Sequence, residues 1–191
     1  MGNREDLLAG ARQCLFDKGY ARTTVRDIAT ASGVSMAAIG YHFGSKEALL
    51  TAALGEATRE WGDELASTLA GAPEDPETSD PLRRFASRWD AVRESVGTHR
   101  GLWAATFDAL SHPETRAQLA AQTDESRAGL ARLLEGAAED DTEAARTIGA
   151  LYQALLIGIA AQSLIDPETA PTGADLAEGL RRITGEPAST E

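Results

Sequence analysis

The stretch that decides the fold is residues 24–43, TVRDIATASGVSMAAIGYHF. Thr24, followed three residues later by Asp27, predicts a helix start, because these side chains can cap the first backbone N–H groups reciprocally. Gly33 predicts the end of that helix, since glycine readily takes the left-handed conformation. Ser35 can then cap a second helix. The pattern predicts a helix-turn-helix, whose second helix can enter the major groove of DNA.

Short motifs surround this stretch in a fixed order: FDKGY at residues 16–20, TTV at 23–25, IA at 28–29, GVS at 33–35 and YHFGSKEALL at 41–50. In order and spacing they resemble the DNA-binding domain of TetR-type (tetracycline-repressor-like) transcriptional regulators. The resemblance covers about a quarter of the chain, residues 4–50, and the remainder matches the family in length and all-helical pattern. It implies a DNA-binding domain at residues 1–45 and a ligand-binding and dimerisation domain at residues 46–191.

The charge of the chain is distributed unevenly. The 191 residues carry a formal net charge of -12, which is unusual for a protein that binds a polyanion. Residues 1–50, however, hold six Lys/Arg and five Asp/Glu, whereas the remainder holds 12 and 25. Repulsion between the acidic remainder and phosphates would orient the N-terminal end toward DNA. A single cysteine excludes an intrachain disulfide framework and fits a reducing compartment, so we expect a cytoplasmic protein. No basic-then-apolar stretch opens the sequence, so we expect no export leader.

Apolar periodicity predicts an all-α fold of about nine helices, with an N-terminal three-helix helix-turn-helix domain. Glycine and proline between periodic segments mark the connections, above all an exposed loop at residues 71–81. A frayed tail is expected at residues 185–191. The expected helices are residues 4–18, 24–32, 36–42, 45–69, 82–96, 99–110, 114–135, 148–165 and 174–184.

Residues 148–165 are apolar nearly all round. A membrane span is the alternative, but the run is marginally short, contains two glutamines and has acidic flanks. We expect instead a helix buried on two sides, against its own core and against a second subunit, and no membrane contact. Together with the 114–135 helix it would form a four-helix bundle between two chains, as the resemblance also implies. The interface residues expected are Leu130, Leu134, Leu151, Leu155, Gly158, Ile159 and Gln162.

Hydroxyl, aromatic and cationic side chains surround the expected second helix. Phosphate contacts supply most of the affinity of a protein for DNA, and base edges supply the specificity. We therefore expect phosphate contacts from Thr24, Tyr41, His42 and Lys46, a base or phosphate contact from Arg26, and a nearby contact from Thr23. Ser35, Ala37, Ala38 and Gly40 would face the groove, where the alanine methyl groups can touch thymine. The simpler interpretation makes Thr24 and Ser35 helix caps only, and His42 a core residue.

One position departs from the family pattern. Many relatives have an aromatic residue where this chain has Gly40, with Tyr41 directly after it. Gly40 gives up a contact and about 1 kcal/mol of helix stability relative to alanine. It therefore leaves open which bases the end of the helix contacts.

Large aromatic residues gather in the middle of the chain, at Trp61, Phe85, Trp89, Trp103 and Phe107. The resemblance implies a ligand pocket in the C-terminal domain, and aromatic walls suit a largely apolar small molecule. Aromatic residues at helical spacing are also typical of an ordinary core, and the sequence does not separate the two interpretations. We further expect ligand binding near Trp61 to move the long helix at residues 45–69 and so release the DNA.

Two other classes of function compete with a regulator. An enzyme is disfavoured, because His42, His99 and His112 are the only histidines and no cluster indicates a catalytic or metal site. We therefore assign no catalytic residue, no metal ligand and no cofactor. The second competitor is an acidic helical ligand-binding or interaction module that has lost specific DNA binding. We expect a homodimeric, ligand-responsive repressor that binds a palindromic double-stranded operator.

Overall fold

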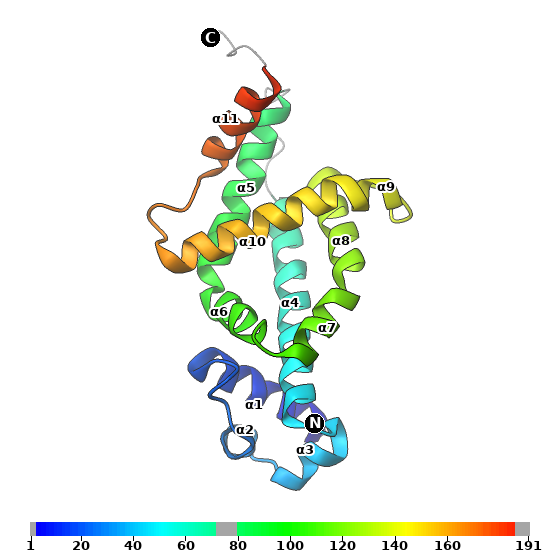
Figure 1. Cartoon of the computed structure of the whole chain (residues 1–191), viewed down its shortest axis with the longest axis vertical. Helices are drawn as coiled ribbons and strands as arrows, with labels where there is room; N and C mark the ends of the chain where they lie inside the picture. Colours follow the sequence, from blue (N-terminus) through cyan, green and yellow to red (C-terminus); the bar gives the residue numbers. More distant parts are fainter. Residues whose placement is uncertain (1–2, 72–79, 186–191) are drawn as a thin grey trace. The chain divides into compact units, whose positions relative to one another are not determined.

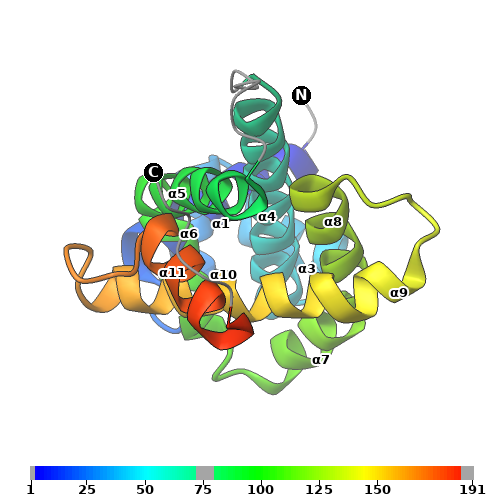
Figure 2. The same cartoon turned by 90° about the horizontal axis from the view of Figure 1, so that it is seen from above.

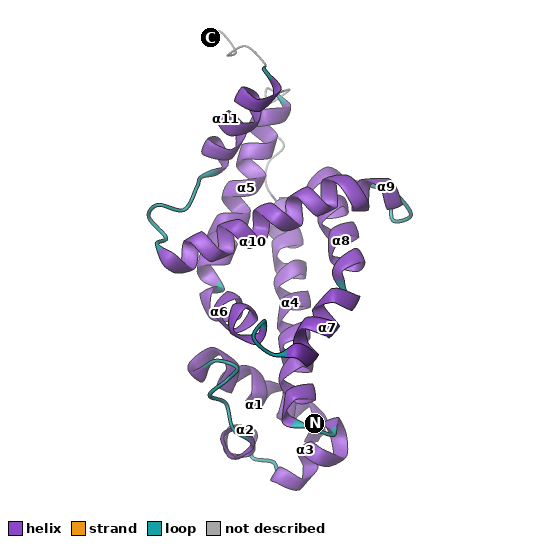
Figure 3. Ribbon diagram, viewed as in Figure 1, coloured by secondary structure: helices purple, strands orange, loops and turns teal. Residues whose placement is uncertain are grey.

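The computed structural model describes residues 3–71 and 80–185, and every regular element within them is helical (Figure 3). The predicted all-α class is therefore confirmed. Nearly all of the predicted 71–81 loop and of the 185–191 tail lies outside the described residues. The helices, labelled in Figure 1, are α1 (Asn3–Lys18), α2 (Val25–Ser32), α3 (Met36–Phe43), α4 (Lys46–Gly71), α5 (Pro81–Thr98), α6 (Arg100–Ala109), α7 (Pro113–Ala121), α8 (Thr123–Glu135), α9 (Thr142–Ala144), the π-helix η1 (Ala145–Gly149), α10 (Ala150–Ile165) and α11 (Gly173–Thr184).

The chain divides into two compact units that are each discontinuous in sequence. The first unit comprises Met1–Asp63 and His99–Thr123, and the second comprises Glu64–Thr98 and Asp124–Glu191. Compact packing therefore does not follow the predicted division between residues 45 and 46. Most of α4, together with α6 and α7, belongs to the same unit as α1, α2 and α3.

The helix-turn-helix of the first unit has the predicted local geometry except at Ser35, which occupies the N-cap position of α3 but makes no side-chain capping hydrogen bond. The Thr24 hydroxyl accepts from the Asp27 N–H, and the Asp27 carboxylate accepts from the Thr24 N–H at 2.9 Å, which completes the capping box. Gly33 ends α2 at φ 69° and ψ 13°, in the left-handed region. Ile28 and Ile39 are fully buried and hold the two helices against α1.

The long helix α4 is started by its own cap, because the Ser45 hydroxyl accepts from the Ala48 N–H at 3.0 Å. Its buried face follows three- and four-residue steps through the first unit. Burial of this face removes apolar surface from water and so stabilises the helix. The buried residues of that face are Leu49, Leu50, Ala53, Leu54, Ala57 and Trp61.

The predicted single helix at residues 114–135 is wrong, because α7 ends at Ala121 and α8 begins at Thr123. The Gln122 N–H bonds to carbonyls of the preceding turn, and the Thr123 hydroxyl donates to the Leu119 carbonyl. Two acids, Asp124 and Glu125, then occupy the first turn of α8, where the helix dipole favours negative charge. Apolar spacing does not register a one-residue interruption of this kind.

The second unit packs α10 and α11 on α5, and Figures 1 and 2 both show α11 beside α5. Two glycines allow close approach. A Cβ at Gly173 would lie 1.9 Å from the Ala86 carbonyl oxygen on α5, and a Cβ at Gly149 would lie 2.3 Å from that of Arg127 on α8. The Arg127 side chain also donates to Gln153 on α10 at 3.0 Å. These contacts fix α8 and α10 against each other within one subunit.

Candidate nucleic-acid interface

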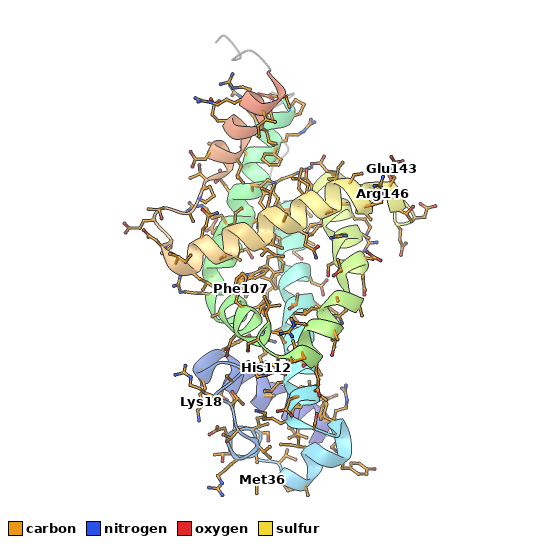
Figure 4. The ribbon with its side chains drawn as sticks, viewed as in Figure 1. Lys18, Met36, Phe107, His112, Glu143 and Arg146 are labelled. Atoms are coloured by element: carbon orange, nitrogen blue, oxygen red, sulfur yellow. The ribbon has the colours of Figure 1, made fainter. Side chains whose placement is uncertain are left out.

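Helix α3 presents most of its surface to solvent. Only Ile39 is buried, while Tyr41 is 85% exposed and stacks edge-on against His42 with ring centroids 4.9 Å apart. Met36 projects from the first turn and is about half exposed (Figure 4). Of the residues predicted to face the groove, Ser35, Ala37 and Gly40 are exposed and Ala38 is partly exposed. A solvent-exposed helix with one anchoring residue has the geometry of a recognition helix.

Gly40 lies on this exposed surface with empty space around it. A Cβ built at this position would meet no atom within 4 Å apart from its immediate surroundings in the helix. Its glycine is therefore not required by packing against any other part of the described chain. A larger side chain fits here in the free protein. Gly40 therefore affects the stability of α3 and the contacts that α3 makes with other molecules.

The cations of the head, defined as residues 3–50, are mostly engaged. Lys18 pairs with Asp27 at 2.6 Å, Arg12 pairs with Glu60, and the Arg4 guanidinium lies over the Phe43 ring. The exception is Arg26, which is exposed on the first turn of α2. Within residues 3–71 and 80–185, its guanidinium has no hydrogen bond or ion pair. Arg26 is therefore the cation of α2 that is available to an external phosphate or base.

Two of the residues predicted to contact DNA make hydrogen bonds within the head. The Thr23 side chain is buried, and its hydroxyl donates within the head to the Gly19 carbonyl at 2.7 Å and lies 3.1 Å from that of Cys14. It cannot reach DNA, because it is buried and hydrogen-bonded within the turn after α1. The Lys46 ammonium donates to the Thr23 carbonyl at 3.0 Å, and its side chain is only 22% exposed. Lys46 therefore stabilises this turn with one of its N–H donors, and only the remaining donors could bind a phosphate.

Asp27 joins the cap of α2 to the end of α1. Its pKa is held far below the ordinary value, first by the Lys18 hydrogen bond and then by the bonds from the Thr24 side chain and backbone. The Thr24 hydroxyl donates to the same carboxylate at 2.7 Å. Thr24 thus serves as a helix cap, which is the simpler of the two roles considered for it. Its exposed position leaves a phosphate contact as a prediction.

Sequence reasoning missed two groups that hold the turn between α1 and α2. The Asp108 carboxylate at the end of α6 accepts from the Ala21 N–H. The Tyr20 hydroxyl accepts from Thr115 at 3.0 Å and lies 3.3 Å from the Thr51 hydroxyl, in a buried polar cluster. No short-range spacing connects residues so far apart in sequence. The one available signal was the polar Thr51 on an otherwise apolar helix face.

The predicted ligand-binding aromatics fall into two groups. In the first unit Trp61 on α4 meets Trp103 on α6 edge-on, with ring centroids 5.0 Å apart and planes at 87°, and Phe107 lies one turn further along α6. In the second unit Phe85 and Trp89 pack with Tyr152, with centroids 5.6–6.3 Å apart. The latter three rings fill their own core.

A polar group lies beside the second aromatic cluster. The Tyr152 hydroxyl donates to Glu135, and burial followed by that bond raises the pKa of Tyr152 well above its ordinary value. Arg88 donates to the Leu134 carbonyl and lies 3.9 Å from the Glu135 carboxylate. Its charge is thereby partnered within the second unit.

Two surface clefts are lined by other residues. One, of about 470 Å³, lies between the end of α1 and α6 and includes Phe16, Arg22 and Asp108. The other, of about 340 Å³, lies on α5 and includes Asp90, Arg93 and Ser163. Neither contains any of the five predicted ligand-binding aromatics.

The predicted dimer residues divide between core and surface. Leu130, Leu134 and Ile159 are buried within the subunit, so their assignment to an interface is wrong; helical periodicity turns them toward their own core. Leu151 and Gln162 are exposed, and Leu155 and Gly158 are partly exposed. Four large apolar residues of η1 and α10 are exposed, and we name them together the α10 outer row: Ile148, Leu151, Ile157 and Ile165.

The segment Thr142–Ile165 is, by length and composition, apolar enough to cross a membrane, and 33% of its most apolar window is buried within the chain. The four residues of the α10 outer row belong to the unburied part. Within the described ranges, no group of three or more His, Cys, Asp or Glu side chains is placed to hold a metal ion.

A capped helix-turn-helix with an exposed second helix and an available arginine defines the class of helix-turn-helix DNA-binding proteins. Residues 7–53 match the family described as bacterial regulatory proteins, tetR family. The transcriptional repressor AcnR of Corynebacterium glutamicum is 39% identical over 101 residues, 49% of this chain and 48% of AcnR. The regulator BetI of Stenotrophomonas maltophilia is 30% identical over 122 residues, 64% of this chain and 61% of BetI.

The similarity to solved structures extends over nearly the whole chain. The multidrug binding protein EbrR, solved in complex with imidazole, is 25% identical with a TM-score of 0.63, covering 97% of this chain and 92% of EbrR. This chain belongs to the TetR family of bacterial regulators. By the extent of its matches, the chain spans about half the length of the AcnR relatives.

Proposed function

We propose that the protein is a DNA-binding transcriptional regulator that represses transcription from a palindromic operator and is released by a small molecule. The observation that carries the proposal is the exposed face of α3, with Tyr41 at its end, beside the available guanidinium of Arg26. Phosphates and base edges are the groups that such side chains bind. Repression is favoured over activation because the AcnR relatives are named repressors.

A palindromic operator requires two copies of the head, and the α10 outer row supports a homodimer. Leu151 is 48% exposed and Ile165 is 84% exposed, on a helix whose other face is buried. Large apolar side chains gathered on one surface mark an interaction site in a soluble protein. A second copy of the same row would cover them through a two-fold contact. We assign the protein to the cytoplasm, where operator DNA is accessible, and propose no membrane contact and no catalytic role.

Release of DNA by a ligand requires a physical connection between the ligand-binding residues and the head. Such a connection lies within the first unit. Trp61 and Trp103 join α4 to α6, and Asp108 at the far end of α6 binds the head at Ala21. A ligand that changes the Trp61–Trp103 contact would act on both helices that hold the head. The coupling would lower DNA affinity by about 1–3 kcal/mol, the usual range for allosteric proteins.

Selection of bound duplexes from a random DNA pool tests the proposal. Enrichment of a palindromic sequence is the expected result, and Tyr41→Ala should abolish retention of the enriched duplex. Ile183→Ala, which removes a similarly exposed apolar side chain from α11, is the control and should retain it. Placing the enriched site over a promoter should then make transcription in vitro fall as protein is added. Failure to enrich any sequence at 50 mM salt would refute the DNA-binding role.

The acidic interaction module remains the second candidate, and one observation favours it. Lys46 and Thr24, two of the predicted phosphate contacts, are engaged inside the head. If the module interpretation holds, Tyr41→Ala and Arg26→Ala will leave all measured binding unchanged. The duplex selection therefore separates the two candidates.

A further inference from the structure

One buried donor in the first unit has no acceptor. The side chain of Trp103 is 7% exposed, and its indole Nε1–H makes no hydrogen bond to any described residue. Buried polar groups in proteins are almost always paired, and an unpaired buried donor destabilises a fold by about 1–3 kcal/mol. A ligand that supplied an acceptor would recover that loss, because it would form a hydrogen bond without displacing one.

The surroundings of Trp103 restrict what such an acceptor can be. Its immediate neighbours on α6, Leu102 and Ala105, are buried, and Trp61 packs against its ring from α4. An anion placed among these side chains would lose its hydration, whereas a carbonyl oxygen would lose far less. Phe107, which lies one turn from Trp103 on α6 and is labelled in Figure 4, is only partly buried and adds a further apolar ring.

We propose that the effector is a neutral, largely apolar molecule carrying a carbonyl or comparable hydrogen-bond acceptor, and that the Trp103 indole N–H donates to that acceptor. This inference rests on the proposed ligand-responsive function and specifies its ligand. Trp61 supplies an apolar wall to the same molecule. Phe85 and Trp89, the two predicted ligand-binding aromatics of the second unit, have no role in this proposal and are core residues of that unit.

The test compares two probes that differ only in the acceptor, 1-indanone and indane. The full-length protein is labelled with ¹⁵N in the tryptophan indoles, and its three indole N–H resonances are assigned with Trp61→Phe, Trp89→Phe and Trp103→Phe. We expect 1-indanone to move the Trp103 resonance downfield in a saturable titration, as a new hydrogen bond requires. Indane, which has no acceptor, should not move it in that direction.

Trp103→Phe tests the same bond energetically, since it keeps an aromatic ring and removes the N–H. It should weaken 1-indanone binding about five-fold, the value of one neutral hydrogen bond, and leave indane binding unchanged. Trp89→Phe, the matched control in the second unit, should alter neither affinity. If Trp103→Phe fails to fold, the resonance titration of the unaltered protein decides the question alone.

Three results would overturn the inference: no movement of the Trp103 resonance up to the solubility limit of 1-indanone, equal movement with both probes, or equal loss of both affinities in Trp103→Phe. The first is expected if the N–H rests on the face of the Trp61 ring instead, a weak interaction. Retention of the selected duplex is measured on the same preparation. DNA retention without probe, together with a silent Trp103, rejects the ligand chemistry only, whereas absence of DNA retention without probe rejects the regulator.

Discussion

The Asp108 carboxylate, on the last turn of α6, accepts a hydrogen bond from the Ala21 backbone N–H with Oδ2 and N 3.0 Å apart. The same oxygen crowds Gly19, where a Cβ would lie 3.0 Å from it and where φ is +82°. The contact spans 87 residues of sequence and holds the turn that leads into α2. Asp108 is thus a positioning residue for Thr24 and Arg26, although it is remote from the exposed face of α3.

Asp108→Ala should loosen the head. Loss of a charge-assisted hydrogen bond to a partly exposed backbone N–H is expected to lower the free energy of unfolding by about 1 kcal/mol. Urea unfolding measures this change, and Asp140→Ala provides a control that removes an exposed aspartate from a turn. DNA affinity should fall with the stability of the head. An unchanged unfolding midpoint would show that the Ala21 contact contributes nothing in solution.

Arg26→Ala should weaken DNA binding in a salt-dependent way. If the guanidinium neutralises one phosphate, the slope of log affinity against log salt concentration will become shallower by about 1. Arg84→Ala removes an exposed arginine from α5 and should leave the slope unchanged. An Arg26→Ala variant with an altered sequence preference and an unaltered slope would instead assign Arg26 to a base edge.

Gly40→Ala should stabilise the protein by about 1 kcal/mol, because alanine favours a helix over glycine and a Cβ meets nothing here. Gly149→Ala is the opposite case. Its Cβ would collide with the Arg127 carbonyl, and the forced shift should destabilise the second unit by about 1–3 kcal/mol. Denaturant melts of both variants measure the difference, and destabilisation by Gly40→Ala would indicate that α3 is packed more closely than described.

Leu151→Glu should dissociate the dimer, because it places a charge in the middle of the α10 outer row. Sedimentation equilibrium of the purified protein reports the mass directly. The matched control is Ile183→Glu, which adds the same charge at an exposed isoleucine of α11 and should leave the dimer intact. If the unaltered protein is monomeric at every concentration, or if both variants dissociate, the α10 outer row is not the interface.

Acidification should remove the contribution of Asp27. Its folded-state pKa lies below that of the unfolded chain, so this stabilisation is present above about pH 4 and is lost progressively as the pH falls below that value. The difference in unfolding midpoint between the unaltered protein and Asp27→Asn should therefore shrink as the pH is lowered from 6 toward 3. Asp140→Asn, at an exposed turn, should show no comparable narrowing. A constant difference over this range would contradict the role of the Asp27 charge.

The sequence by itself determined the local structure of the head and the all-helical class of the chain. Capping by Thr24 and the left-handed turn at Gly33 depend on residues within three or four positions of one another, so they can be recognised from spacing alone. The same holds for the family motifs at residues 16–50. Apolar periodicity identified the long helices, but it joined α7 to α8, because an interruption at Gln122 leaves the three- and four-residue spacing nearly intact.

Only the tertiary structure decided which faces are buried and which polar groups meet. In the tertiary structure, Thr23 and Lys46 make hydrogen bonds within the head. Leu134 and Ile159 are buried in the core. Asp108 contacts Ala21, and Trp61 contacts Trp103. These outcomes depend on contacts between residues tens of positions apart, and periodicity marks an apolar face without indicating what covers it. The physical reason is that burial and hydrogen-bond pairing are properties of packed surfaces, whereas helix starts and ends are set by the residues next to them.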